Sequence, residues 1–229
     1  MSHQKMRLHG SDIPKLAGKI MKIILARHGE TKWNIEEVFR GRVNVELNET
    51  GIKQAGLLAK YLSDFKIDAV YSSPLKRALK TAEIVAGYHK LRVEIAPGLI
   101  DLDFGKWQGL CLKDVRDNYK ELYTEWVNHP ERVKMPDGES LNDVRERAIT
   151  VIDDVIAKYK ETAVLVSHRV VNKVLICALL GLDNSHFWNI KQDTCGTSTF
   201  IYENGRFILV EHNNTSFMKP LRQAPLSDF

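Results

Sequence analysis

Cysteine is scarce in this 229-residue sequence, which contains three such residues, Cys111, Cys177 and Cys195. They are widely spaced, odd in number and free of any C-x-x-C pair. This set does not fit the disulfide framework of a small secreted domain or the paired cysteines of a zinc site. It is typical of a protein that stays in a reducing compartment.

Long apolar runs are also missing. No run approaches the roughly 20 residues that a membrane-spanning helix needs, and residues 1–20 lack the apolar centre of a secretory signal. Internal repeats and low-complexity tracts are absent too. We therefore expect a cytoplasmic protein without a membrane partner.

An excess of one charge sign is absent from most of the chain. The net charge is +4, but residues 1–20 carry +3 of it, with four Lys or Arg residues against one Asp. The rest is close to neutral and has no basic stripe interleaved with aromatic residues, so we expect no nucleic-acid partner. Met21 opens the first predicted strand, and residues 1–20 are expected to be an N-terminal extension, whether a leader, a tag or a disordered arm.

Segments rich in β-branched residues alternate with segments of helical periodicity. This alternation predicts an α/β fold with a mostly parallel sheet flanked by helices. With 44% hydrophobic residues, the chain can bury its core as one domain or at most two small ones. Strands are predicted at about 21–27, 69–72, 92–95 and 163–166, followed by a hairpin of about 197–203 and 207–211 around Asn204-Gly205.

Apolar residues at helical spacing predict four principal helices outside the irregular middle of the chain. The first is expected to be capped by Thr50 and to bury Ile52, and the second to begin at Ser73-Pro74. A long third helix should follow a capping box at Ser140, and the fourth should cover about 170–180.

Residues 97–139 are less regular and contain three prolines and four glycines. Within them, one amphipathic helical stripe is formed by Leu112, Val115, Tyr119, Leu122 and Trp126. Long excursions inside compact domains are usually functional, so we interpret this segment as a cap inserted over the active face. The stripe is equally compatible with ordinary core packing, and both roles can hold together.

Three predicted strands end in polar or cationic residues: one at Arg27-His28, one at Ser72-Ser73 ahead of Arg77, and one at Ser167-His168. The carboxyl ends of parallel strands emerge at one edge of the sheet, where ligands bind in open α/β folds. Two arginines and two histidines meeting there would form a phosphate site, because guanidinium groups bind phosphate oxygens bidentately. For Arg77 alone, a solvated helix charge is the competing interpretation.

Several motifs follow one another in order along residues 21–215. They are Leu25-Ala26-Arg27-His28-Gly29-Glu30-Thr31 with Trp33-Asn34, then Leu47-Asn48-Glu49-Thr50-Gly51, Ser72-Ser73-Pro74-Leu75-Lys76-Arg77-Ala78 and Val166-Ser167-His168. In this order they resemble the motifs of the histidine phosphatase superfamily, the phosphoglycerate mutase-like proteins. The resemblance implies a Rossmann-like three-layer α/β/α sandwich over 21–215, with 216–229 as a C-terminal tail.

The resemblance also implies a mechanism. His28 would be the nucleophile that attacks phosphorus in line and forms a phosphohistidine. A backbone carbonyl should hold its other ring nitrogen, so that a neutral, correctly oriented tautomer attacks. The mechanism requires no metal or other cofactor, and the sequence offers no carboxylate cluster to hold a metal.

The phosphate would be held by Arg27, Arg77 and His168, which would also offset charge in the transition state. Further phosphate-binding residues are expected at Asn34, Gly41 and Arg169. Arg169 is a departure, because a glycine commonly follows the second histidine in this family. It either adds a cation that would favour a substrate with a second negative group, or points away and pairs with a cap carboxylate.

The general acid is a second departure. Family members usually place a glutamate shortly before a Phe-Gly-x-Trp-Glu-Gly stretch, and here Asp101 holds that position ahead of Phe104-Gly105-Lys106-Trp107-Gln108-Gly109. An aspartate can transfer the same proton, although it is one methylene shorter and more acidic. We expect Asp101 to be the acid, with Asp103 as the alternative and a turn-capping role for Asp101 as the competing interpretation.

These features predict a metal-independent phosphomonoesterase acting on a small phosphorylated metabolite, resembling α-ribazole phosphatases and broad-specificity phosphatases. Phosphoglycerate mutases carry a longer insertion before the segment that here reads Gly138-Glu139-Ser140. Two alternatives stay open: a cofactor-dependent phosphoglycerate mutase, and a catalytically weak phosphate-binding pseudoenzyme. The oligomeric state is open as well, and an exposed edge strand of the C-terminal hairpin would allow a homodimer.

Overall fold

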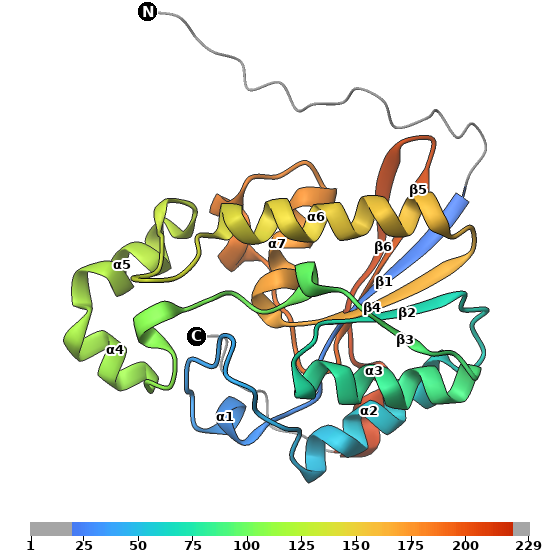
Figure 1. Cartoon of the computed structure of the whole chain (residues 1–229), viewed down its shortest axis with the longest axis horizontal. Helices are drawn as coiled ribbons and strands as arrows, with labels where there is room; N and C mark the ends of the chain where they lie inside the picture. The colour runs from blue at the N-terminus through green and yellow to red at the C-terminus, as the bar shows by residue number, and fades with distance from the viewer. Residues whose placement is uncertain (1–19, 222–229) are drawn as a thin grey trace, which may run out of the picture.

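The computed structural model describes residues 20–221 and contains a six-stranded sheet between two layers of helices (Figure 1). The strand order is β3-β2-β4-β1-β5-β6, with the first four strands parallel and the last two antiparallel to their neighbours. The bounds are β1 Ile20–Arg27, β2 Ala69–Ser72, β3 Val93–Ile95, β4 Thr162–Ser167, β5 Thr197–Glu203 and β6 Arg206–Asn214. The mostly parallel α/β fold predicted from the sequence is confirmed.

Helices cover both faces of the sheet, with α2 and α3 on one face and α6 and α7 on the other (Figure 1). The α-helices are α1 Lys32–Ile35, α2 Glu49–Leu62, α3 Lys76–His89, α4 Leu112–Asn118, α5 Lys120–Asn128, α6 Leu141–Lys158 and α7 Arg169–Leu179. Short 3₁₀ turns are η1 Pro97–Leu99, η2 Gly105–Trp107, η3 Pro130–Arg132, η4 Asn184–Asn189 and η5 Ser216–Leu221. No helix within 20–221 is long and apolar enough to cross a membrane.

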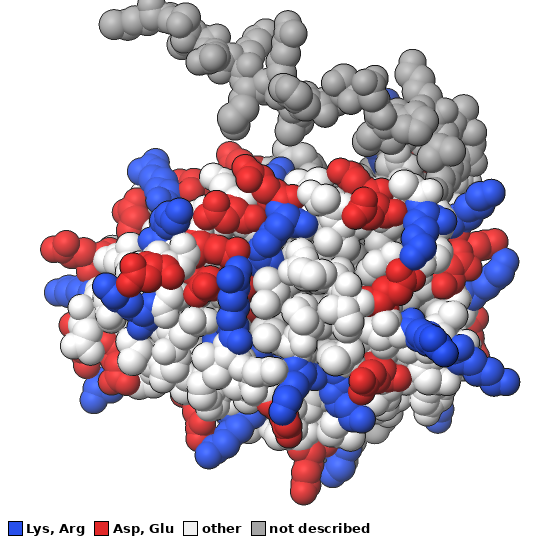
Figure 2. All heavy atoms as spheres, in the orientation of Figure 1, with Lys and Arg blue, Asp and Glu red and all other residues white. Residues whose placement is uncertain are grey.

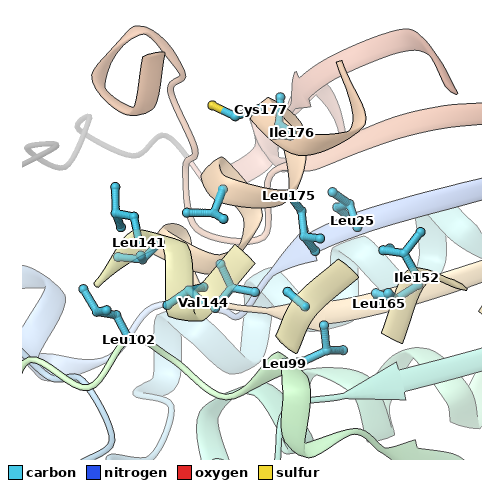
Figure 3. Close-up of a cluster of buried hydrophobic side chains, with 14 of the residues drawn as sticks. Leu25, Leu99, Leu102, Leu141, Val144, Ile152, Leu165, Leu175, Ile176 and Cys177 are labelled. Carbon is cyan, nitrogen blue, oxygen red and sulfur yellow. The ribbon is translucent and has the colours of Figure 1, made fainter. Parts of the chain in front are cut away.

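The central strands are buried on both faces, which is why they read as continuous apolar runs. In β1, Ile23 and Leu25 join the cluster under α6 and α7, whereas Ile24 and Ala26 join the cluster under α2 and α3. Figure 3 shows Leu25 of this strand packed among side chains of β4, α6 and α7. Two separate layers of core therefore hold the sheet.

The register brings the predicted strand ends to one edge. Arg27 of β1 lies opposite Ser167 of β4, and Ser72 of β2 lies opposite Val166. The residues that follow these three strands therefore emerge side by side.

Two predicted helix starts are wrong. Asn48, rather than Thr50, caps α2, since its side chain accepts a hydrogen bond from the Gly51 amide at 2.8 Å. The buried face of α2 then runs through Ala55 and Leu58, and Ile52 lies outside it with 40% of its surface exposed. Helix α3 begins at Lys76, two residues after the predicted start at Pro74, because Leu75 still has extended geometry (φ −73°, ψ 135°).

In the segment 97–139, which was predicted to be a cap, the helical stripe is not continuous. Its apolar stripe is carried by two helices, α4 and α5, which break at Tyr119 because that residue leaves helical geometry (φ −129°, ψ 38°). Val115 and Trp126 are buried in the cluster that also contains residues of β1 and α6, so the stripe packs as core.

Near the C-terminus, η5 packs on α2, where Phe217 stacks on Tyr61 with ring centroids 4.8 Å apart. The predicted N-terminal extension up to residue 19 and the tail from 222 lie outside the described residues.

The position of the α2 cap is testable by substitution. Asn48→Ala removes the bond to Gly51 and also a 2.8 Å bond to Glu30, so it should lower the free energy of unfolding by about 1 kcal/mol or more. Thr50→Ala should change it by less than about 0.5 kcal/mol. Urea unfolding of both variants measures the difference, and equal losses would contradict the assignment.

Candidate active site

The three strand ends place two histidine rings together in the interior. His28 follows β1 and His168 follows β4, and their ring centroids lie 5.2 Å apart. Both side chains are almost completely buried. The neighbouring Arg27 donates a hydrogen bond from Nη1 to the Gln192 carbonyl at 2.6 Å, which fixes it beside them.

His28 is held in a defined tautomer. Its Nδ1 lies 2.6 Å from the carbonyl oxygen of Gly29. A carbonyl can only accept, so the proton is on Nδ1 and the lone pair is left on Nε2. Burial, followed by the positive charges of Arg77, Arg27 and Arg40, lowers the pKa of His28 well below its ordinary value. The ring is therefore neutral near pH 7.

His168 is neutral for related reasons. Burial is the largest cause that lowers its pKa, and the charge of Arg77 comes next. Its Nε2 lies 2.7 Å from the Ser73 hydroxyl oxygen, and its Nδ1 lies 3.6 Å from Asp101 Oδ2. Ser73, predicted as part of a polar strand end and as the start of a helix, thus contacts the second histidine.

Arg77 is fully buried and is fixed by three acceptors. Its guanidinium donates to the carbonyls of Val43 and Gly41 at 2.9 and 2.8 Å and to Asp101 Oδ2 at 3.0 Å. Gly41, predicted as a phosphate ligand, therefore contacts Arg77 through its carbonyl. Its φ of +49° and a Gln108 oxygen 2.3 Å from the place of a Cβ explain why glycine is needed there.

The two candidate acids are clearly separated. Asp101 is 5% exposed and faces Arg77 and His168. Asp103 instead lies 3.4 Å from Arg42 and accepts a hydrogen bond from the Gly105 amide at 2.9 Å. The structure thus brings Asp101, and not Asp103, to the paired histidines.

The two remaining predicted ligands lie at the start of helices. The Asn34 side chain is buried at the third position of α1, and its amide oxygen accepts from both the backbone and the hydroxyl of Thr31 at 2.9 Å. Arg169 is the first residue of α7 and is 7% exposed. Its charge is among those that lower the pKa of Arg40, so it adds a cation close to the cluster.

Arg40, Thr81 and Gln54 are buried polar residues that sequence reasoning missed. Burial and three neighbouring arginines lower the pKa of Arg40, whose Nη1 donates to the Trp33 carbonyl at 2.9 Å. The only sequence signal for Thr81 is its position one helical turn after Arg77. Arg40 lies in an irregular loop, where periodicity carries no information.

The face of the molecule drawn in Figure 2 has mixed charge. On the face in Figure 2, lysine and arginine side chains are interspersed with aspartate and glutamate rather than gathered into a stripe. Among residues 20–221, no group of three or more His, Cys, Asp and Glu side chains is arranged to hold a metal ion.

Comparisons with known proteins agree on one family. A family model described as the histidine phosphatase superfamily, branch 1, matches residues 23–215. Phosphoserine phosphatase 1 of Hydrogenobacter thermophilus is 37% identical over 197 residues, which cover 86% of this chain and 93% of that protein. Adenosylcobalamin/α-ribazole phosphatase of Escherichia coli is 31% identical over 178 residues, 76% of this chain and 86% of that protein. The structure of Bacillus stearothermophilus YhfR superposes with a TM-score of 0.83 and 28% identity, covering 87% of this chain and all of that one.

Arg40→Met tests the electrostatic coupling of the cluster. It removes a positive charge that lowers the pKa of both histidines, so the pKa of His28 and that of His168 should rise. Titration followed by histidine ¹⁵N NMR measures both values. Lys53→Met, at an exposed position of α2, should leave them unchanged. Unshifted histidines in Arg40→Met would contradict the coupling.

Proposed function

The chain belongs to the histidine phosphatase superfamily and hydrolyses a small phosphate ester, and we propose that His28 is the nucleophile of this reaction. The observation that supports this role most directly is the 2.6 Å contact between His28 Nδ1 and the Gly29 carbonyl. Burial and the neighbouring arginines keep the ring neutral, and the contact then leaves the lone pair on Nε2, next to a cluster of cationic side chains. A neutral imidazole is the form that can attack phosphorus.

In the proposed first step, the Nε2 lone pair forms a bond to phosphorus while the bond from phosphorus to the leaving oxygen breaks. Arg27, Arg77 and His168 bind the phosphoryl oxygens and offset their charge in the transition state. Arg169 adds positive charge nearby. Asn34 and Gly41 act indirectly, Asn34 by ordering the loop at Thr31 and Gly41 by holding Arg77.

We assign proton transfer to Asp101. Its proton passes to the leaving oxygen in the first step. In the second step, water attacks the phosphorus of the phosphohistidine and gives one of its protons to Asp101. The nitrogen–phosphorus bond breaks, which releases inorganic phosphate. The carboxylate lies 3.0 Å from Arg77 and 3.6 Å from His168 Nδ1, so it borders the position of the reacting group.

Phosphoserine is the first physiological substrate to test, because the relative with 37% identity over 93% of its own length is named a phosphoserine phosphatase. A phosphoglycerate mutase would instead interconvert phosphoglycerates on addition of 2,3-bisphosphoglycerate and would release little phosphate. A pseudoenzyme would bind phosphoesters without turnover.

We also propose that the enzyme is cytoplasmic, has no nucleic-acid partner and can form a homodimer. Free thiols at Cys111, Cys177 and Cys195 favour the cytoplasm, and the mixed surface charge favours a protein without a nucleic-acid partner. Strand β6 lies at the edge of the sheet and exposes Ile208 and Val210. This edge would allow a homodimer.

Hydrolysis of p-nitrophenyl phosphate with and without EDTA tests the mechanism. Activity should persist in EDTA and fall by roughly 10³-fold or more in His28→Ala, because the nucleophile is lost. His186→Ala removes a half-exposed histidine outside the cluster and should retain activity. Activity abolished by EDTA, or retained in His28→Ala, would overturn the mechanism.

The role of Asp101 predicts a dependence on the leaving group. Asp101→Asn should lower kcat by roughly 10²- to 10⁴-fold for phosphoserine, whose alkoxide needs a proton. The loss should be smaller for p-nitrophenyl phosphate, since p-nitrophenolate leaves without one. Asp103→Asn is the matched control, and a loss in that variant with Asp101→Asn unaffected would reassign the acid.

A further inference from the structure

We propose that Thr81 and Gln54 are positioning residues that fix the Gly29 backbone and thereby the orientation of the His28 ring. The inference rests on the proposed role of His28 as nucleophile. Both side chains are fully buried, and neither belongs to the set that contacts the phosphate in the proposed mechanism.

Thr81 holds one side of Gly29. Its hydroxyl donates to the Arg77 carbonyl at 2.9 Å, one turn earlier in α3, and accepts from the Gly29 amide at 3.1 Å. A hydroxyl has one hydrogen, so its donation to Arg77 turns its lone pairs toward Gly29. The helix that carries Arg77 therefore also anchors the loop after β1.

Gln54 holds the other side. Its side-chain oxygen accepts from the Glu30 amide at 2.7 Å, and its nitrogen donates to the Thr194 hydroxyl at 3.0 Å. The Glu30 N–H and the Gly29 carbonyl belong to the same planar peptide group. Fixing that N–H therefore sets the direction of the carbonyl that accepts from His28 Nδ1.

The loop has little other freedom. A Cβ on Gly29 would lie 2.5 Å from the Gly51 carbonyl oxygen, and a Cβ on Gly51 would lie 2.1 Å from that of Glu30. The loop thus packs backbone to backbone against α2. Within this contact, Thr81 and Gln54 supply the directional bonds that select one carbonyl orientation.

Thr81→Val keeps the shape of the side chain and removes its hydroxyl, whereas Thr81→Ser keeps the hydroxyl. We expect kcat to fall roughly 10- to 100-fold in Thr81→Val, as for a misplaced reacting group, and to stay within about threefold of wild type in Thr81→Ser. KM, and inhibition by inorganic phosphate, should change little, because Arg27, Arg77 and His168 remain. Gln54→Met should behave like Thr81→Val.

Thr150→Val is a matched control. The Thr150 hydroxyl, on the solvent-exposed side of α6, also donates to a carbonyl one turn earlier, that of Glu146, at 3.1 Å. It should leave kcat unchanged. Histidine ¹⁵N NMR gives a readout independent of turnover: His28 should carry its proton on Nδ1 in wild type and Thr81→Ser and show a mixed tautomer in Thr81→Val.

The proposal is overturned if Thr81→Val retains wild-type kcat and the Nδ1–H tautomer, or if Thr81→Ser loses as much activity as Thr81→Val. A parallel loss of phosphate binding would also overturn it, since that would indicate general damage to the site. Retained hydrolysis in His28→Ala would instead contradict the proposed nucleophile. In that case the tautomer measurement would still test whether Thr81 fixes the orientation of the His28 ring.

Discussion

The burial of positive charge is the constraint on which the site depends. Arg77 is fully buried, and Arg27 and Arg40 are nearly so. A buried guanidinium is costly unless its N–H groups are bonded, and these groups find backbone carbonyls of Gln192, Trp33, Val43 and Gly41. The irregular loops around the sheet edge therefore have fixed positions because they supply acceptors to arginines. The loop carbonyls fix the positions of the guanidinium groups, and the same hydrogen bonds fix the loops.

The same charges set the protonation of the histidines. Burial disfavours an imidazolium, and the nearby arginines disfavour it further, so the pKa of each ring is lowered. A site that binds an anion with these arginines would therefore also keep the proposed nucleophile, His28, neutral. Phosphate binding and a neutral, nucleophilic imidazole would then have the same cause, which is the placement of cationic side chains beside a buried histidine. The chemistry of the family is in this sense a consequence of where three strands end.

The parts of the fold that were predictable from the sequence are those with local signals. Central strands buried on both faces read as apolar runs, and Ser140 with Asp143 forms the capping box that its spacing predicts. The α2 cap at Asn48 was missed because several neighbouring polar residues could serve, and tertiary contact with Glu30 favours one of them. Arg40, Thr81 and Gln54 were missed because their burial depends on partners distant in the chain. Periodicity assigns a polar residue to solvent unless its partner is known.

The replacement of the usual glutamate by Asp101 is accommodated by the backbone. Arg147 of α6 donates to the carbonyls of Gly98 and Ile100 at 2.7 and 2.6 Å and to that of Asp101 at 3.1 Å. It is itself paired with Glu139 at 3.0 Å. This clamp fixes the main chain just ahead of the carboxylate, and the shorter side chain still lies within 3.0 Å of Arg77. The position of the Asp101 carboxylate is therefore set by where Arg147 holds the backbone from Gly98 to Asp101. The missing methylene does not remove the proposed acid from the site.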